Sequence, residues 1–218
     1  MRRIRGRNTN DELLHIRVPR SFRIVLNGSS NDVAIQDIEG DVEVGVNNGD
    51  VMMEKIGGRV RIAGIRGDIG LVDVANGVQV TSASGDIIMR NVRGSIRVTT
   101  TGGDVMMTDA RAQSISVETM NGDVLFSGLL ADAGRSSVST HSGDVRLELT
   151  PDVRAQIEMQ SFSGKITSQL PLVLLPRKSE QDNDGVRRLQ LGREGGAVLA
   201  ISTFSGNIEI VRIGARNN

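Results

Sequence analysis

The feature that most constrains this sequence is a Gly-Asp pair that returns about every 18 residues, each time before a short alternating apolar segment. Val or Ile follows the pair at these glycines: Gly49, Gly67, Gly85, Gly103, Gly122 and Gly143. A looser turn lies about halfway between successive pairs, as at Gly58 and Gly77. Regular short repeats of this length predict a solenoid, in which each coil stacks on the previous one and buries its apolar side.

The apolar–x–apolar triplets after the turns predict strands with one buried face, because side chains alternate across a strand. The sequence predicts one inward ladder at Val51/Met53, Ile69/Leu71, Ile87/Met89 and Val105/Met107, and a second at Val42/Val44, Val60/Ile62, Val78/Val80 and Ile96/Val98. A further apolar position, two residues before a glycine, is expected to fill the corners: Ile38, Ile56, Ile65 and Val92. The predicted fold is all-β, a single-stranded parallel β-solenoid (β-helix) with about 18 residues per coil and with its handedness left open.

The whole chain, residues 1–218, is expected to form one solenoid domain. Residues 168–197 interrupt the C-terminal coils with two apolar stretches around a polar tip. This pattern predicts an inserted loop or hairpin that leaves the solenoid and returns at residues 198–201. Such an insert would cover an open edge of the last coils, which otherwise exposes unpaired backbone groups.

The composition argues against several classes of partner. With 26 basic and 26 acidic side chains the formal net charge is zero, and aromatic residues, which stack on single-stranded bases, make up 2%. We therefore expect no nucleic-acid partner. No apolar run approaches the roughly 20 residues that span a bilayer. The basic start RRIRGR (2–7) lacks the apolar core of a signal peptide, so membrane contact is expected only through a segment that this chain does not contain.

Aspartates at the repeated turn position would stack into a ladder: Asp50, Asp68, Asp86, Asp104, Asp123 and Asp144. Carboxylates about 4.8 Å apart repel one another unless turn amides or a cation pair with them. Calcium is the metal alternative, because it takes carboxylate oxygens. The G-G-x-G-x-D spacing of calcium-binding nonapeptide solenoids is absent, so the ladder is interpreted as structural, with no metal or cofactor site.

Two motifs allow functional interpretations that their context weakens. Arg66-Gly67-Asp68 spells an integrin-recognition tripeptide, yet it is the regular Gly-Asp turn preceded by Arg. His141, Ser142 and Asp144 could suggest a nucleophile and its base, but neighbours in one turn rarely meet the required geometry. Since Cys is absent and His15 is the only other histidine, a zinc site is not expected. No catalytic residue is assigned, and no enzyme is expected.

The outward positions of the strands differ between the two faces. After the Gly-Asp turns they are Ala34, Met52, Gly70, Ile88, Met106 and Leu125, and on the other face Glu43, Arg61, Gln79, Arg97 and Ser116. An uncharged row of this kind generally marks a contact surface. The candidate interaction stripe is therefore Met52, Ile88, Met106 and Leu125. It could contact a protein partner, a second copy of the chain, or the chain's own N-terminal segment or insert.

Three stretches carry a family resemblance. These are IRVPRSFRIVLNG near the start, the repeated T-x-x-G-D-V units, and the closing pair QSFSGKI and ISTFSGNIEI, with S-F-S-G at 161–164 and T-F-S-G at 203–206 as the most specific part. In these stretches the chain resembles the bacterial and archaeal DUF4097 family of adhesin-like proteins, over about residues 14–213. The resemblance implies a single-chain β-solenoid that is exported or associated with the cell envelope.

The expected function is therefore a non-enzymatic, adhesin-like structural or interaction protein of the cell envelope. The alternative is a self-assembling scaffold or filament, at the surface or in the cytoplasm. A cytoplasmic location stays open because no export segment is visible in the sequence.

Overall fold

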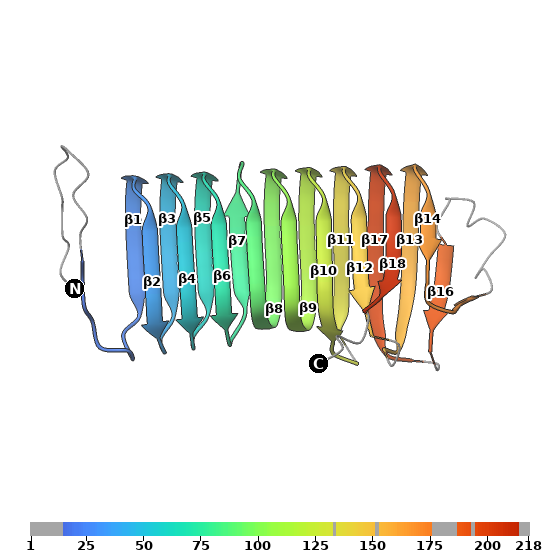
Figure 1. Cartoon of the computed structure of the whole chain (residues 1–218), viewed down its shortest axis with the longest axis horizontal. Helices are drawn as coiled ribbons and strands as arrows, with labels where there is room; N and C mark the ends of the chain where they lie inside the picture. Colours follow the sequence, from blue (N-terminus) through green and yellow to red (C-terminus); the bar gives the residue numbers. More distant parts are fainter. Residues whose placement is uncertain (1–14, 133, 151–152, 176–186, 193–194, 214–218) are drawn as a thin grey trace.

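The chain folds into a rod of stacked coils (Figure 1). The computed structural model describes residues 15–132, 134–150, 153–175, 187–192 and 195–213. Every regular element within these residues is a β-strand, and each coil places strands on two opposing faces. Equivalent residues of successive coils pair in parallel, as Val51 does with Val33 and with Ile69. The prediction of a parallel β-solenoid with coils of about 18 residues is confirmed.

One face, called the Asp face here, is built from the strands that follow the Gly-Asp turns. Its rungs occur along the rod in this order: β2 (Val33–Ile38), β4 (Val51–Ile56), β6 (Ile69–Val74), the first part of β8 (Ile87–Gly102), the first part of β9 (Val105–Asn121), β10 (Val124–Leu130), β12 (Val145–Leu149), β18 (Ile208–Arg212) and β14 (Ile166–Ser168). Each of these rungs pairs in parallel with its neighbour, so one residue position forms a continuous row along the face.

The second face, called the opposite face, carries the other strand of each coil. Its parallel rungs are β1 (Ile24–Ser30), β3 (Val42–Asn48), β5 (Val60–Arg66), β7 (Val78–Ser82), the second parts of β8 and β9, β11 (Arg135–Ser142), β17 (Ala197–Ser205) and β13 (Ala155–Ser163). Beyond β13 the face ends in two antiparallel strands, β16 (Arg187–Leu191) and β15 (Leu172–Leu174).

The last coil in the sequence is not the last coil in the rod. Strand β17 pairs with β11 on one side and with β13 on the other, and β18 lies in the same way between β12 and β14. In Figure 1 the red coil of β17 and β18 accordingly separates the yellow coil of β11 and β12 from the orange coil of β13 and β14. The sequence analysis did not predict this order.

The antiparallel strands explain why β13 is terminal. Strand β16 pairs with residues 155–159 of β13, so Ile157 faces Leu189, and β15 pairs in turn with β16. An antiparallel strand at this edge prevents a further parallel coil from stacking there. Both strands come from the predicted insert at 168–197, whose polar tip, KSEQDNDG at 178–185, lies outside the described residues.

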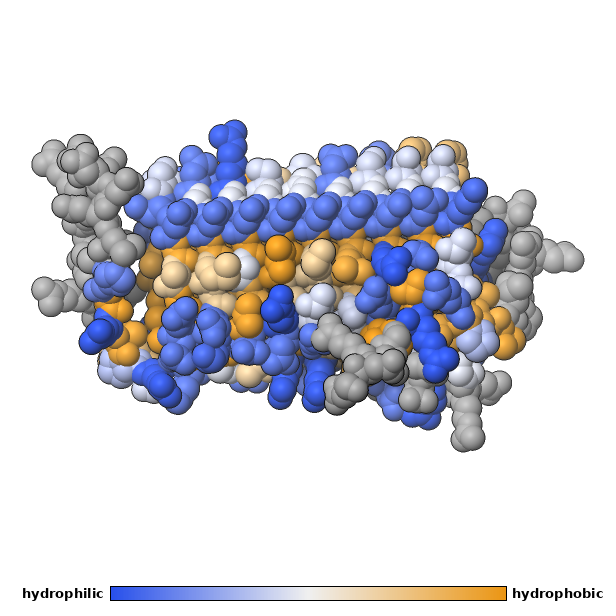
Figure 2. Space-filling model, in the orientation of Figure 1, coloured by the Kyte–Doolittle hydropathy of each residue, from blue (hydrophilic) through white to orange (hydrophobic). Residues whose placement is uncertain are grey.

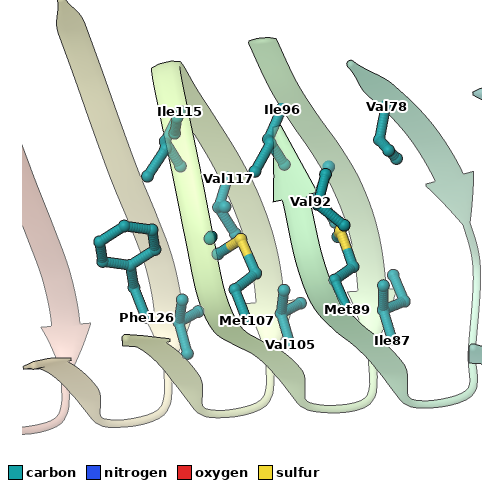
Figure 3. Close-up of a cluster of buried hydrophobic side chains, with 14 of the residues drawn as sticks. Val78, Ile87, Met89, Val92, Ile96, Val105, Met107, Ile115, Val117 and Phe126 are labelled. Carbon is teal, nitrogen blue, oxygen red and sulfur yellow. The ribbon is translucent and has the colours of Figure 1, made fainter. Parts of the chain in front are cut away.

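The space between the two faces is filled by the predicted inward ladders. Every side chain in those ladders is buried, including Met53, Leu71, Met89 and Met107. Figure 3 shows part of this core, with Met89 and Met107 among the side chains that point inward and with Phe126 beside Met107. Burial of one such side chain contributes about 1.5–3 kcal/mol as an upper estimate, repeated in every coil.

One predicted corner residue, Ile65, is exposed rather than buried. Ile38, Ile56 and Val92 are buried as predicted, because each follows a residue with a left-handed backbone at Asp37, Lys55 or Asn91. That backbone conformation interrupts the strict alternation and turns the next side chain inward. Ile65 lies at the other corner, before the Gly-Asp turn, where the alternation continues and points it outward.

The alternation predicts opposite outcomes for two neighbouring substitutions on β9. Val105→Asp buries a carboxylate between Ile87 and Val124, where no partner is available, and should cost about 4 kcal/mol or prevent folding. Met106→Asp points outward and should change stability by no more than about 1 kcal/mol. Urea unfolding followed by circular dichroism measures both. Equal losses would show that the inward and outward assignment is wrong.

Candidate interaction surface

The turn aspartates form a hydrogen-bonded ladder along one border of the Asp face. In each rung a carboxylate oxygen accepts a hydrogen bond from the backbone N–H of the aspartate one coil on. The N···O distances from Asp68 to Asp50, Asp86 to Asp68, Asp104 to Asp86, Asp123 to Asp104 and Asp144 to Asp123 are 2.8, 2.9, 2.9, 2.8 and 2.7 Å. Each exposed carboxylate therefore satisfies a turn amide of the neighbouring coil.

The ladder is longer at both ends than the sequence analysis predicted. It begins at Asp32, which accepts from the Asp50 amide at 2.9 Å. Past Asp144 it continues to Asn207, whose amide donates at 2.7 Å, and the Asn207 side-chain oxygen accepts from the Lys165 amide at 3.0 Å. The G-N-I and G-K-I units of the sequence mark the two C-terminal rungs, at Asn207 and Lys165, but neither unit contains an aspartate.

The turns also explain the Arg66-Gly67-Asp68 tripeptide. Gly67 has φ of +127°, and a Cβ atom there would lie 2.1 Å from the carbonyl oxygen of Gly49, so the stacked coils require glycine. The Asp68 carboxylate accepts a hydrogen bond from the next coil. Both residues thus have structural roles in the turn.

The stripe itself is exposed to solvent. Met52, Ile88 and Met106 are 54%, 49% and 42% exposed, and Leu125 is half-buried. Gly70 interrupts the row, but the Met52 side chain lies over it, since a Cβ atom on Gly70 would be 2.6 Å from the Met52 sulfur. Figure 2 shows an apolar band below a row of evenly spaced polar residues, with hydrophilic residues interrupting the band toward the C-terminal end of the rod.

The described parts of the two segments that could cover the stripe lie elsewhere. Strands β15 and β16 join the opposite face through β13, and Ile16 and Phe22 of the N-terminal segment are themselves exposed. Within the described residues, the stripe is therefore available to another molecule.

The stripe ends in a shallow cavity of about 710 Å³ near the C-terminal end of the rod. Met106 and Leu125 contribute apolar lining, and Arg146, Lys165 and Glu209 contribute charged groups. Arg146 donates to Glu209 at 2.7 Å, an ion pair between neighbouring rungs of the same outward row. The apolar row thus changes to a charged row after Leu125.

A polar row borders the other side of the stripe. It consists of the left-handed residues Asp37, Lys55, Asp73, Asn91 and Asp109, whose φ angles lie between 50° and 57°. Lys55 contacts Glu54 at 2.9 Å, and this contact, with Asp37 and Asp73 nearby, raises the pKa of Lys55. An apolar strip between two polar rows has the arrangement of an interface core with a polar rim.

Two members of the possible nucleophile set, His141 and Asp144, are engaged in other contacts. The His141 ring stacks on Phe204, with ring centroids 4.9 Å apart, and the Asp144 carboxylate accepts from Asn207. His15 lies at the exposed start of the described chain. On the opposite face Glu43 pairs with Arg23 at 3.0 Å. The described residues contain no group of three or more histidine or acidic side chains placed to hold a metal ion.

Sequence reasoning missed a row of buried hydroxyl groups. The threonine of the T-x-x-G-D units is buried at Thr100, Thr119 and Thr140, and Thr203 of the related T-F-S-G-N unit is buried as well. The threonine hydroxyl donates to a carbonyl oxygen of the adjoining turn, for example from Thr100 to Gly102 at 3.0 Å. The recurrence of threonine three residues before the turn glycine is the sequence feature that could have predicted these buried hydroxyl groups.

Comparison with known protein families shows to which family the chain belongs. Residues 4–211 match the model of the family described as Toastrack DUF4097. The chain belongs to this Toastrack family. The confirmed solenoid and the family match agree with the resemblance found in the sequence.

One solved structure similar to the Toastrack chain is described as a "putative cell adhesion protein" from Clostridium sporogenes ATCC 15579. It is 11% identical, with a TM-score of 0.45, over 58% of this chain. The match spans 59% of that protein's chain. No curated protein matches the Toastrack chain. Among the described residues, no helix is long and apolar enough to cross a membrane.

The ladder geometry predicts that the acceptor at each turn matters more than its charge. Asp86→Ala removes the oxygen that accepts from the Asp104 amide and should cost about 1 kcal/mol of unfolding free energy. Asp86→Asn keeps an acceptor and removes a charge between Asp68 and Asp104, so it should cost much less. Urea unfolding of the two variants tests this. Equal losses would mean that the negative charge itself is needed.

The structural interpretation of the ladder also predicts the response to calcium. Because backbone amides already pair with the carboxylates, neither a chelator nor millimolar calcium should change the melting temperature. Differential scanning fluorimetry measures this. A rise of several degrees with calcium would reveal a site in the native state, because a ligand that binds only the folded protein stabilises it.

Proposed function

We propose that this Toastrack protein is a non-enzymatic, adhesin-like interaction protein of the cell envelope that binds a protein partner through its apolar stripe. The observation that carries the proposal is the row of exposed Met52, Ile88 and Met106, continued by half-buried Leu125, between two polar rows. The envelope location rests on the family resemblance.

The geometry of the rod suits a preformed binding surface. The stripe residues are fixed by parallel backbone pairing on both sides, as Ile88 is between Gly70 and Met106. A partner that binds there loses little free energy to ordering of the protein surface. Covering apolar surface contributes about 25 cal/mol per Å², so a partner that covers the full length of the stripe could be held specifically.

A self-assembling scaffold is the second candidate function. Its supporting observation is that the stripe residues repeat at the coil spacing of about 4.8 Å. A second copy of the chain would present a stripe with the same spacing. Two rods could then align side by side through matching rows. The partner-binding function and the scaffold use the same surface, so one pair of variants tests both.

The test is the double substitution Ile88→Lys with Met106→Lys, compared with Gln79→Lys with Ser116→Lys on the opposite face. Both pairs alter outward residues and introduce two lysines. Binding to envelope preparations, with and without protease treatment, and size-exclusion chromatography with light scattering measure the two functions. We expect the stripe variant to lose protease-sensitive binding at an unchanged melting temperature, while the control retains it.

Other outcomes decide against the proposal. If oligomers dissociate and envelope binding is unaffected, the stripe serves the scaffold function. If the monomer melts earlier, the stripe belongs to internal packing. If binding, oligomeric state and melting temperature all stay the same, the stripe is not a contact surface, and both functions lose their support.

A further inference from the structure

A second surface lies at the corner before the Gly-Asp turns, in the last three coils. Three similar four-residue units meet there: T-H-S-G at 140–143, T-F-S-G at 203–206 and S-F-S-G at 161–164. They become neighbours only because β17 lies between β11 and β13, which pairs Ser205 with both Ser142 and Ser163. The unusual coil order therefore assembles this surface from distant parts of the sequence.

The second residue of each unit projects a ring to the outside, and the three rings stack. The centroids of His141 and Phe204 are 4.9 Å apart with an interplanar angle of 4°. Those of Phe204 and Phe162 are 4.8 Å apart at 6°. This row of three rings is called the ring ladder here.

Hydroxyl groups beneath the ring ladder fix its backbone. Thr203 donates to the carbonyl oxygen of Gly143 at 3.2 Å, and Ser161 donates to that of Gly206 at 2.9 Å. Each bond links one unit to its neighbour. The rings are thus held in place before any ligand binds, which lowers the ordering cost of binding.

The ring ladder contributes little to the core. Phe162 is 78% exposed and Phe204 is 49% exposed, whereas Phe126 in the core is 1% exposed. Large exposed aromatic groups that gather at one place usually serve recognition, because they combine a large contact area with few rotatable bonds. Phe162 is the last ring of the stack. Within the described residues, Phe204 is the ring that stacks on one of its faces, and no aromatic ring stacks on the other face.

Neutral polar side chains border the ring ladder on both sides. One border contains Ser139 and Ser202, whose hydroxyl oxygens are 3.0 Å apart, and the other contains Ser142, Ser205 and Ser163. Hydroxyl groups both donate and accept hydrogen bonds. The surface therefore offers aromatic area and uncharged hydrogen-bonding groups together, unlike the stripe with its charged borders.

This combination fits one class of ligand. A neutral sugar ring has a face of C–H groups, which suits the negative face of an aromatic ring, and a rim of hydroxyl groups, which suits serine. A purely apolar ligand would cover the hydroxyls of Ser142, Ser205 and Ser163 without offering them a hydrogen-bond partner, and burial of unpaired polar groups is costly. We infer that the ring ladder is a binding site for a neutral glycan, with Phe162 as the platform for one sugar ring.

The aromatic composition allows a direct experiment. The protein has 4 Phe, 2 His, no Trp and no Tyr, so the ring-proton region of its NMR spectrum is simple. Soluble chito-, cello- and xylo-oligosaccharides are titrated in parallel into the full chain. We expect at least one of them to shift the Phe162 and Phe204 signals saturably, while the Phe126 signals stay unchanged.

Variants then test the role of the ring. Phe162→Ser should weaken glycan binding about tenfold or more, and Phe162→Tyr should retain it because the aromatic face remains. The matched control is Phe22→Ser, which removes an exposed phenylalanine outside the ring ladder and should leave binding unchanged. Melting temperatures of all variants should stay at the parental value, since both positions are exposed.

Three results would overturn the inference. The first is that none of the glycans shifts the signals saturably at millimolar concentration. The second is that Phe162→Ser binds glycan as well as the parent does. The third is that the parent binds no glycan and forms oligomers that dissociate in Phe162→Ser. The last would make the ring ladder a contact between copies. The lysine pair at Ile88 and Met106 should not affect glycan binding, so this inference and the proposed function can fail independently.

Discussion

Parallel pairing of each strand with the equivalent strand one coil away is the interaction on which the rest of this structure depends. Apart from local register shifts next to Phe126 and Gly94, it places residues of the parallel strands directly on their counterparts, so any property that recurs at the coil spacing becomes a row along the rod. The apolar rows close the core, the aspartate row satisfies the turn amides, and the outward rows become surfaces. One backbone interaction thus determines both the stability of this Toastrack protein and the pattern that it shows to other molecules.

The sequence predicts this arrangement well where the repeat is regular. Alternation and turn spacing identify the inward ladders, and the same rule identifies Met52, Ile88 and Met106 as outward residues. The rule fails at Ile65 because the two corners of a coil differ in backbone conformation. At both corners an apolar residue stands two positions before a glycine, so the sequence pattern does not distinguish them. It also misses the inward hydroxyl row, because Thr100 and its equivalents are polar residues whose partners are turn carbonyl groups.

The order of the last coils could not be predicted for a different reason. The three C-terminal coils share the same inward pattern, so side-chain periodicity fits any order of stacking. What decides between the orders is the antiparallel pairing of β16 with β13, a contact between segments with irregular spacing. The ring ladder depends on that order, so sequence reasoning could find the T-H-S-G, T-F-S-G and S-F-S-G units but not their proximity.

The interposed position of β17 and β18 has a consequence for biosynthesis. Coils up to β12 can stack as they leave the ribosome, since each needs only the coil before it. The coil of β13 and β14 has no parallel neighbour until residues 197–212 have been made. The distal end of the rod can therefore close only after residues 197–212 have been synthesised, and a chain cut short before β17 would lose two coils rather than one.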